Sequence, residues 1–408
     1  MFPIRCLLLT SCLLLHACAE GKKDSDQTSA SEVKISASHF MYGFGGDQLI
    51  TDYPIPTSAV GTDGGFLTMT EIGEYTIKRT GSSPSSPVQY LLDADGLLKL
   101  VVPILGRAPT RYFGAYQQTG SGDLTQTFFF TDRYAPKDIA VVGFYWGTRS
   151  TTGHDMSKAR GDWHMFSQHV LFSSSSSPNP HNIGRAFAGS LTIAAGTDTD
   201  DELSGSGFDS SSPNEITLKG TARALDTTGE IDFNLLYDAD PRSIGASQAK
   251  DIILGADRDE TDGETGLFAL VRKFEFTDLD KAKAALAGRW HVGLQTIFVA
   301  PTVAGIDAAN GTMTIDDKGG FKIEVIGSLG PGAGEETYRG SYEFVETATV
   351  GKWENLIELS VDGTNETWWA AVDSLYGSLV LLDLTVESRA SGSPQLNMGL
   401  AVREVDDD

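Results

Sequence analysis

The chain has 408 residues and carries 55 Asp and Glu against 31 Lys and Arg, so its formal net charge is −24 at pH 7. The basic residues form no stripe that would oppose this charge. Because an acidic surface repels polyanions, nucleic acid and anionic lipid surfaces are poor partners. The length is sufficient for two or three domains, each with its own hydrophobic core.

Residues 1–17 have the pattern of an export signal, with Arg5 followed by an apolar run that is too short to span a bilayer. The run ends in Leu15-His16-Ala17-Cys18, which resembles the lipobox of bacterial lipoproteins. The resemblance implies cleavage before Cys18, acylation of its sulfur, and anchoring in the outer membrane with the protein on the periplasmic or the surface side. An ordinary signal peptide or a short membrane anchor is the alternative. Residues 18–35 are polar and without periodicity, which predicts a flexible tether.

Two tryptophan motifs indicate a duplication. Gly161-Asp162-Trp163-His164 recurs as Gly288-Arg289-Trp290-His291, at a separation of 127 residues, and Gln168 and Gln295 follow at the same offset. A repeat of that length is one small domain. The motifs predict β domains over 155–277 and 278–408. Residues 36–154 lack the tryptophan motif and are interpreted as a degenerate first copy, or as a different β domain of similar size.

From residue 39 onward the sequence consists of short runs rich in Val, Ile, Thr, Phe and Tyr, cut by Gly, Asp and Ser. This pattern predicts an all-β fold, either a sandwich or an up-and-down barrel. Glycines Gly43 to Gly46 are interpreted as a turn. The one clear helix covers 278–287, with Thr277 as its cap and Gly288 as its end. Such short helices would connect the domains.

A helix or turn followed by Gly-x-Trp on the first strand, and then by antiparallel strands, resembles the calycin family, which includes lipocalin-like and avidin-like barrels. Gly161 and Trp163, and Gly288 and Trp290, match the opening motif of that family. The resemblance implies two, or with the first copy three, tandem antiparallel up-and-down barrels. It also implies that both tryptophans pack across the closed barrel floor. It carries over no ligand-binding residue.

A lipocalin-like barrel would bind a small apolar ligand between its walls. Alternation along a strand places Val292 and Leu294 on the same inward face as Trp290. Trp368 and Trp369 are adjacent, so one of them must point out of the barrel. These four residues, Val292, Leu294, Trp368 and Trp369, are the candidate ligand-lining set. The alternative for all of them is core packing.

The acidic stretch with Asp257, Asp259 and Asp262 begins like a calcium-binding loop, although no Glu stands at its twelfth position. A solvated hairpin tip is the alternative. His164 and His169 face opposite sides of one strand, so they cannot chelate a metal together there. We therefore expect no cofactor, with calcium as the one metal that the acidic residues suit.

Signatures of enzymes are missing from the sequence, including Gly-x-Ser-x-Gly, a phosphate-binding loop followed by Lys-Ser/Thr, and His-Glu-x-x-His. We expect a lipid-anchored envelope protein that is not an enzyme and that binds a small apolar ligand or an envelope protein. Two alternatives remain. One is a structural or adhesion lipoprotein with filled barrels, and the other is a carbohydrate-active enzyme with paired carboxylates.

Overall fold

A computed structural model describes residues 33–405, apart from 50–59, 80, 103–109, 118–126, 135–138, 150–154, 172–182, 197–198, 211–213, 226–228, 239, 258–263, 301–302, 328–334 and 384–394. Almost every described element is a β-strand, and the strands form three closed barrels of eight antiparallel strands each. The predicted all-β fold with tandem antiparallel barrels is therefore confirmed. The first copy forms a barrel as well. No helix in the described part of the chain is long and apolar enough to cross a bilayer.

Barrel 1 is made by strands β1 to β8, each of which pairs with the next along the chain, and β8 closes the ring on β1. Its strands are β1 (Ala37–Leu49), β2 (Val60–Met69), β3 (Glu74–Arg79), β4 (Val88–Leu92), β5 (Leu97–Val102), β6 (Thr110–Tyr116), β7 (Thr127–Tyr134) and β8 (Ile139–Arg149).

Barrel 2 begins with a 3₁₀ turn (Met156–Lys158) and is closed between β16 and β9. Its strands are β9 (Gly161–Leu171), β10 (Ile183–Ala194), β11 (Asp201–Asp209), β12 (Glu215–Ala224), β13 (Ile231–Tyr237), β14 (Asp240–Ala249), β15 (Ile252–Asp257) and β16 (Glu264–Arg272).

Barrel 3 is closed between β25 and β18, and the two-stranded pairing of β17 with β22 extends its wall. Its elements are β17 (Glu275–Phe276), α1 (Leu279–Leu286), β18 (Gly288–Ala300), β19 (Val303–Ile315), β20 (Gly320–Gly327), β21 (Glu335–Glu346), β22 (Trp353–Val361), β23 (Thr367–Val372), β24 (Ser378–Asp383) and β25 (Gln395–Arg403). The cap of α1 is Asp278, whose carboxylate accepts a hydrogen bond from the Lys281 amide at 3.1 Å. The predicted cap Thr277 was therefore wrong by one residue.

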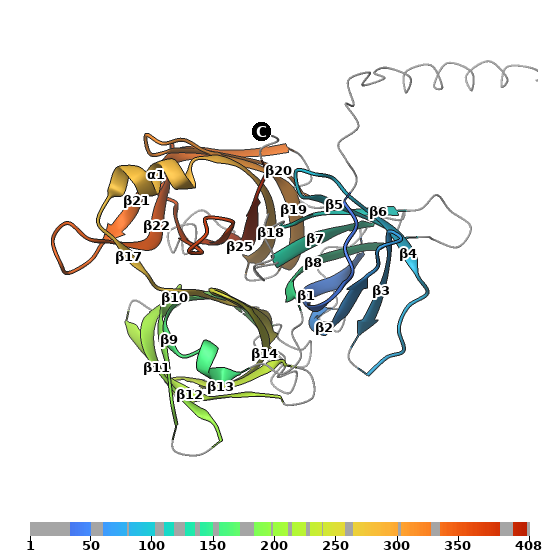
Figure 1. The fold of residues 1–408 in the computed structure, drawn as a ribbon, viewed down its shortest axis with the longest axis horizontal. Helices are drawn as coiled ribbons and strands as arrows, with labels where there is room; N and C mark the ends of the chain where they lie inside the picture. The colour runs from blue at the N-terminus through green and yellow to red at the C-terminus, as the bar shows by residue number, and fades with distance from the viewer. Residues whose placement is uncertain are drawn as a thin grey trace, which may run out of the picture.

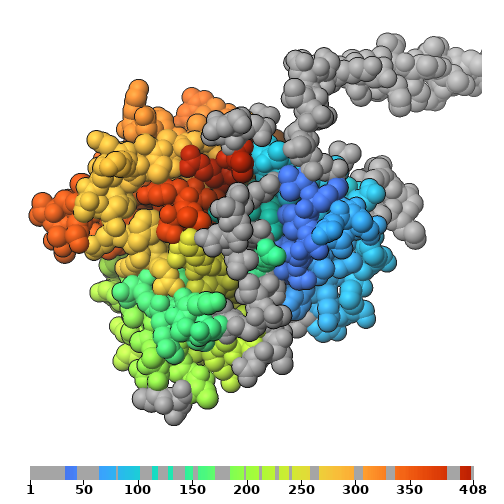
Figure 2. All heavy atoms as spheres, viewed as in Figure 1, coloured from blue at the N-terminus to red at the C-terminus, as the bar shows by residue number. Residues whose placement is uncertain are grey.

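The three barrels are packed side by side around a shared apolar region rather than strung along the chain (Figure 1). We call this region the central cluster. It is formed by the outward-facing side chains of all three barrels, which include Phe40, Phe129, Phe144, Trp146, Phe166, Val170, Leu254, Leu267, Ile297, Leu382, Leu396, Met398 and Leu400. Figure 2 shows barrel 2, in green to yellow, in direct contact with barrel 3, in orange to red. Because these strands are buried on both faces, their sequences are continuous apolar runs rather than alternating apolar and polar residues.

Each barrel also has its own interior core. Large rings fill much of this space, among them Phe128 and Phe130 in barrel 1, Trp163 and Phe233 in barrel 2, and Trp290 in barrel 3. An eight-stranded barrel is just wide enough to be filled by side chains or to hold one small ligand. The question for function is therefore where the packing leaves space.

The prediction of a turn at Gly43 to Gly46 was wrong, because these residues lie inside β1. The glycines have a packing role instead. A Cβ at Gly43 would lie 2.1 Å from the ring of Tyr145, and one at Gly143 would lie 2.6 Å from it. The bare backbone of β1 and β8 therefore lets the Tyr145 ring lie against the inner wall of barrel 1.

Candidate functional site

One end of barrel 2 is closed by a tryptophan and an arginine. The indole N–H of Trp163 donates to the Ala159 carbonyl at 2.8 Å, and the Arg272 guanidinium lies 4.2 Å from the centre of the Trp163 ring. Arg272 also donates to the carbonyls of Arg160, at 2.8 Å, and Lys158. Gly161 has a φ of 129° and no room for a Cβ beside this guanidinium. The glycine is therefore required both by its backbone conformation and by the arginine.

Barrel 3 repeats this floor with Trp290, Arg403 and Gly288. The Trp290 indole donates to the Leu286 carbonyl at 3.3 Å, and Arg403 lies 5.8 Å from the ring centre and donates to the Ala287 carbonyl at 2.7 Å. Both tryptophans are buried in the interior of their barrels at the end where the first strand begins. This is where the sequence motif places them.

In barrel 1 the tryptophan position is occupied by His39. His39 pairs with Leu67 and Arg149 on its two neighbouring strands, as Trp163 pairs with Leu191 and Arg272. Its Nε2 lies 2.8 Å from the hydroxyl oxygen of Tyr116. The arginine that ends the last strand of each barrel was the signal that sequence reasoning missed, since Arg149 marks the first copy where its tryptophan is missing.

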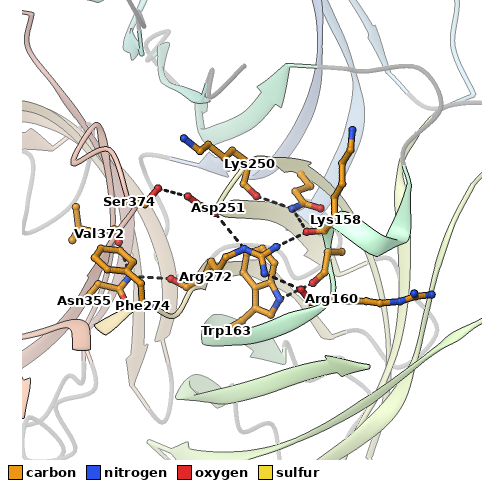
Figure 3. Close-up of polar contacts among 12 residues, drawn as sticks. Lys158, Arg160, Trp163, Lys250, Asp251, Arg272, Phe274, Asn355, Val372 and Ser374 are labelled. Atoms are coloured by element: carbon orange, nitrogen blue, oxygen red, sulfur yellow. Dashed lines mark hydrogen bonds and ion pairs between the residues drawn. The ribbon is translucent and has the colours of Figure 1, made fainter. Parts of the chain in front are cut away.

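Barrels 2 and 3 are joined by a dense set of polar contacts, drawn in Figure 3. Asn355 is completely buried, and its amide nitrogen donates to the carbonyls of Arg272, at 3.0 Å, and Val372, at 2.6 Å. Its amide oxygen accepts from the Phe274 amide at 3.0 Å and lies 3.2 Å from Nε2 of His164. One side chain thus fixes the linker after barrel 2 to the wall of barrel 3.

A polar groove of about 600 Å³ runs beside this joint, lined by Asp162, Ser190, Leu191, Thr192, Arg272, Lys273, Phe274, Glu275 and Glu354. The polar and charged side chains that line it contact one another. Lys273 donates to Ser190 at 2.6 Å and lies 3.9 Å from Glu354, and Thr192 donates to Asp162 at 2.6 Å. These pairings explain the groove as part of the joint between the barrels.

The end of barrel 1 opposite His39 contains a pocket of about 340 Å³ among the described residues. Its wall is apolar and aromatic, and its rim is polar; the lining residues are Met41, Tyr75, Ile77, Val88, Phe130 and Tyr145 in the wall, and Arg79, Ser82, Ser83 and Ser85 at the rim. The pocket lies where β3 and β4 separate, because these strands pair over two residue positions only. Ser85 bonds to Ile77 through both its amide and its hydroxyl, which holds the β3–β4 loop over the pocket.

The end of barrel 2 opposite Trp163 is different, because its described strands carry a layer of charged and polar side chains. Strand alternation directs His169, Arg242 and Asp257 inward, in line with the interior residues Met165, Ile244 and Ile253. Nδ1 of His169 and Nη1 of Arg242 each lie 3.6 Å from Oδ2 of Asp257. The same layer contains Ser167, Arg185, Asp209 and Tyr237.

Burial lowers the pKa of the four described histidines, which are His291 in barrel 3 and the three named next. It lowers the pKa of His39 to about 4, and it lowers those of His164 and His169 to about 3, with nearby Lys273 and Arg242 respectively acting in the same direction. Burial also raises the pKa of Asp373 to about 6. At neutral pH the three imidazoles are therefore uncharged.

These shifts predict that the protein loses stability in acid. A histidine whose pKa is depressed by folding stabilises the fold fully above pH 6.5 and loses that contribution as the pH falls toward its folded value. Asp373 acts in the opposite direction, because its raised pKa favours the fold below pH 6. For His164 alone the loss between pH 7.5 and 4.5 is about 2–3 kcal/mol. Urea unfolding at the two pH values checks this, and the variant His164→Gln should show a weaker pH dependence than the wild type.

The structure places the remaining predicted residues as follows. Val292, Leu294 and Trp368 are buried in the interior core of barrel 3, and Trp369 points outward and packs against the central cluster. Of these, Val292 also contributes to a cleft of about 250 Å³ between barrels 1 and 3. Asp257 is a buried ion-pair partner rather than part of an exposed tip. Cys18, Asp259 and Asp262 lie outside the described residues.

Within the described part of the chain, no three His, Cys, Asp or Glu side chains are arranged so that they could hold a metal ion. The prediction of a calcium loop placed Asp257 beside residues that the structure does not describe, so the loop itself stays a prediction. The structure shows that Asp257 also pairs with Arg242 on β14. Nothing in the sequence predicts this contact.

The fold defines the chain as an all-β protein of three closed eight-stranded antiparallel barrels. No family model matches the sequence, and no curated protein matches it. Among solved structures, it is similar to a protein of unknown function from the DUF3598 family of Nostoc punctiforme, with 11% sequence identity and a TM-score of 0.21, over 57% of this chain and 95% of that chain.

The chain is also similar to a double mutant of the vaccine antigen Transferrin Binding Protein B from Haemophilus parasuis, with 8% identity and a TM-score of 0.28, over 92% of this chain and 77% of that chain. Intact Ap-TbpB, with its N and C lobes, matches at 7% identity and a TM-score of 0.25, over 92% of this chain and 78% of that chain. The functional interpretation therefore depends on the geometry of this chain.

Proposed function

We propose that the protein is a non-catalytic binding protein of the bacterial cell envelope, anchored through a lipid on Cys18, that takes a small apolar or amphipathic molecule into the pocket of barrel 1. The lipobox-like sequence supports the anchor and the location. The observation that carries the binding proposal is the pocket of about 340 Å³ between the inner wall of barrel 1 and its β3–β4 loop.

The size and lining of this pocket suit such a ligand. Pockets for small molecules begin at about 300 Å³ and are lined mainly by apolar and aromatic side chains with a few polar groups. Here Met41, Phe130 and the Tyr145 ring supply the apolar wall, and Phe130 and Tyr145 are stacked with centroids 4.8 Å apart. An apolar chain in the pocket would gain burial at roughly 25 cal/mol per Å².

The rim selects which end of the ligand stays outside. Arg79, Ser82 and Ser83 are exposed and stand where the pocket meets solvent. A polar or anionic head group would remain beside them while the apolar part enters the barrel. The interior cores of all three barrels contain fully buried rings, such as Phe128 in barrel 1, Trp163 in barrel 2 and Trp290 in barrel 3, which favours a scaffolding role for the cores and leaves the barrel 1 pocket for the ligand.

Binding can be measured with a fluorescent fatty acid, dansyl-aminoundecanoic acid, added to the full chain. The variant Val88→Trp should weaken binding at least about ten-fold, because an indole at this position fills the space between β3 and β4. The matched control is Val350→Trp, since Val350 is 92% exposed in a turn of barrel 3. Equal affinity in the two variants, or a wild type that does not bind the probe, would contradict the proposal and favour a structural lipoprotein.

A further inference from the structure

The cleft of about 250 Å³ between barrels 1 and 3 combines apolar and charged side chains from both barrels. Its apolar lining includes Leu97, Phe113 and Val292. Its charged lining residues are Asp95, Arg289 and Glu404, and His291 lies among them. The side chains of Asp95 and Arg289 are 43% and 62% exposed, so the cleft meets solvent beside them.

His291 contributes a buried nitrogen atom to this cleft that lacks a partner. The residue is 6% exposed, and its Nε2 forms no hydrogen bond with any described residue. Oδ2 of Asp95 lies 3.9 Å from Nε2, which is longer than a hydrogen bond. Because buried polar atoms normally bond to protein, water or a ligand, the gap between these two atoms is the place where a further group is needed.

The surroundings of His291 make Nε2 a hydrogen-bond acceptor. Burial lowers the pKa of His291, although the charge of Asp95 acts in the opposite direction, so the imidazole is uncharged at neutral pH. A neutral imidazole has one donor nitrogen and one acceptor nitrogen. Oε1 of Glu404 lies 3.6 Å from Nδ1, and its negative charge favours the tautomer with the proton on Nδ1. Nε2 and the Asp95 carboxylate are therefore two neighbouring acceptors.

Asp95 is the carboxylate of the cleft that lacks a cationic partner. Glu404 pairs with Arg289 at 3.1 Å, and Asp93, in the same β4–β5 turn as Asp95, pairs with Lys99 at 2.9 Å. No described lysine or arginine side chain forms an ion pair with Asp95. A cation beside Oδ2 would therefore meet a carboxylate whose charge is not already paired.

We propose that this cleft binds a small primary amine in its protonated form, with the ammonium group between Asp95 and His291 and the carbon chain against Phe113 and Val292. An ammonium nitrogen lies about 2.7–3.2 Å from its acceptors, so it can reach two acceptors that are 3.9 Å apart. The volume of the cleft is below the roughly 300 Å³ at which pockets for drug-sized molecules begin, so the carbon chain is short.

The same separation disfavours a metal ion. A Zn²⁺ ion binds nitrogen and oxygen at about 2.0–2.2 Å, so it would meet Nε2 and Oδ2 at an angle well above the tetrahedral one. In the described part of the chain no third ligand is placed to complete such a site. The apolar lining of the cleft also has no role in holding a bare ion, whereas it suits the carbon chain of an amine.

Saturation-transfer NMR on the full chain, with butylamine and butanol as probes, tests the proposal. The two molecules have the same carbon chain and differ in their head groups. We expect butylamine to receive magnetisation from the protein and to bind at least about ten-fold more tightly than butanol, because hydrogen bonds from a cation to a carboxylate are the stronger kind. No response from butylamine, or equal affinity for the two probes, would overturn the proposal.

Two variants of the β4–β5 turn place the amine. Asp95→Asn removes the charge but keeps the oxygen that accepts from the Leu97 amide, and it should raise the Kd for butylamine at least about ten-fold. The matched control is Asp93→Asn, since Asp93 does not line the cleft and is paired with Lys99. It should change the Kd less than about two-fold. Equal effects of the two variants would contradict the site.

His291→Phe tests the second acceptor, because it keeps a ring and removes Nε2. The Kd for butylamine should again rise at least about ten-fold. Should this variant fail to fold, the shift of the His291 ring protons on addition of butylamine to the wild type decides the point. The shift is expected in the wild type and absent in Asp95→Asn, and a wild type without it would count against His291.

The cleft is separate from the pocket of barrel 1, so the two binding proposals fail independently. Val88→Trp, which fills the pocket of barrel 1, should leave butylamine binding unchanged. Loss of butylamine binding in Val88→Trp would show that the amine enters that pocket, and it would overturn the cleft as the site. Asp95→Asn, in turn, should leave the affinity for the fatty-acid probe unchanged.

Discussion

Trp146→Ala is expected to lower the free energy of unfolding by about 3–5 kcal/mol, the range for removing a large buried aromatic side chain. Trp146 is 0% exposed, although its side chain points out of barrel 1. The ring packs in the central cluster, 5.7 Å from the Phe144 ring, and its N–H donates to the Gly255 carbonyl of barrel 2 at 3.1 Å. The lost packing is therefore between barrels rather than inside one.

This location predicts how the variant unfolds, as well as how much stability it loses. The interior core of barrel 1 is untouched by the change, so barrel 1 should separate from the other two in a transition of its own. Urea unfolding followed by fluorescence and by circular dichroism checks this, because the two probes should no longer coincide. Trp146→Phe, which keeps most of the apolar area, should cost about 1–2 kcal/mol. A loss below that level in Trp146→Ala would show that the central cluster contributes little.

The arrangement of the barrels was the part of the fold that the sequence could not provide. The strand pattern predicted an all-β fold, either a sandwich or a barrel, and the resemblance of the Gly-x-Trp motifs to the calycin family implied closed antiparallel barrels. The central cluster depends on contacts between residues such as Trp146 and Gly255, which are 109 positions apart. In the sequence, Phe144 and Trp146 look like any strand residues, and only the assembled barrels show that their outward face is covered.

The candidate sites likewise divide into those that a local sequence motif predicted and those that depend on the assembled fold. The floor residues Trp163 and Trp290 were found because the motif is local. The pocket of barrel 1 was missed because it arises where β3 and β4 separate. The sequence of neither strand indicates where the two strands stop pairing. The layer around His169 was missed for a different reason. Arg185, Asp209 and Arg242 each sit near the end of a strand, where a charged residue ordinarily signals a solvated turn.

Asn355→Leu is expected to lower the free energy of unfolding by about 3 kcal/mol or more, because it leaves one buried and two half-buried backbone groups without partners. The carbonyls of Arg272 and Val372 would lose their donor, and the Phe274 amide would lose its acceptor. Each such group costs about 1–3 kcal/mol when it remains buried. Leucine has a similar size, so a cavity is not the cause of the loss.

The effect should concentrate at the joint between barrels 2 and 3. The Phe274 amide should exchange its hydrogen on the order of a hundred-fold faster in the variant, since that factor corresponds to about 3 kcal/mol of lost local stability. Asn234→Leu is the matched control, because Asn234 is exposed on the outer face of β13. If Asn355→Leu left the protection of Phe274 unchanged, Asn355 would not be what fixes the linker. The second tie, from Ser374 to Asp251 and on to Arg272 at 3.2 Å, would then be the contact that fixes the linker.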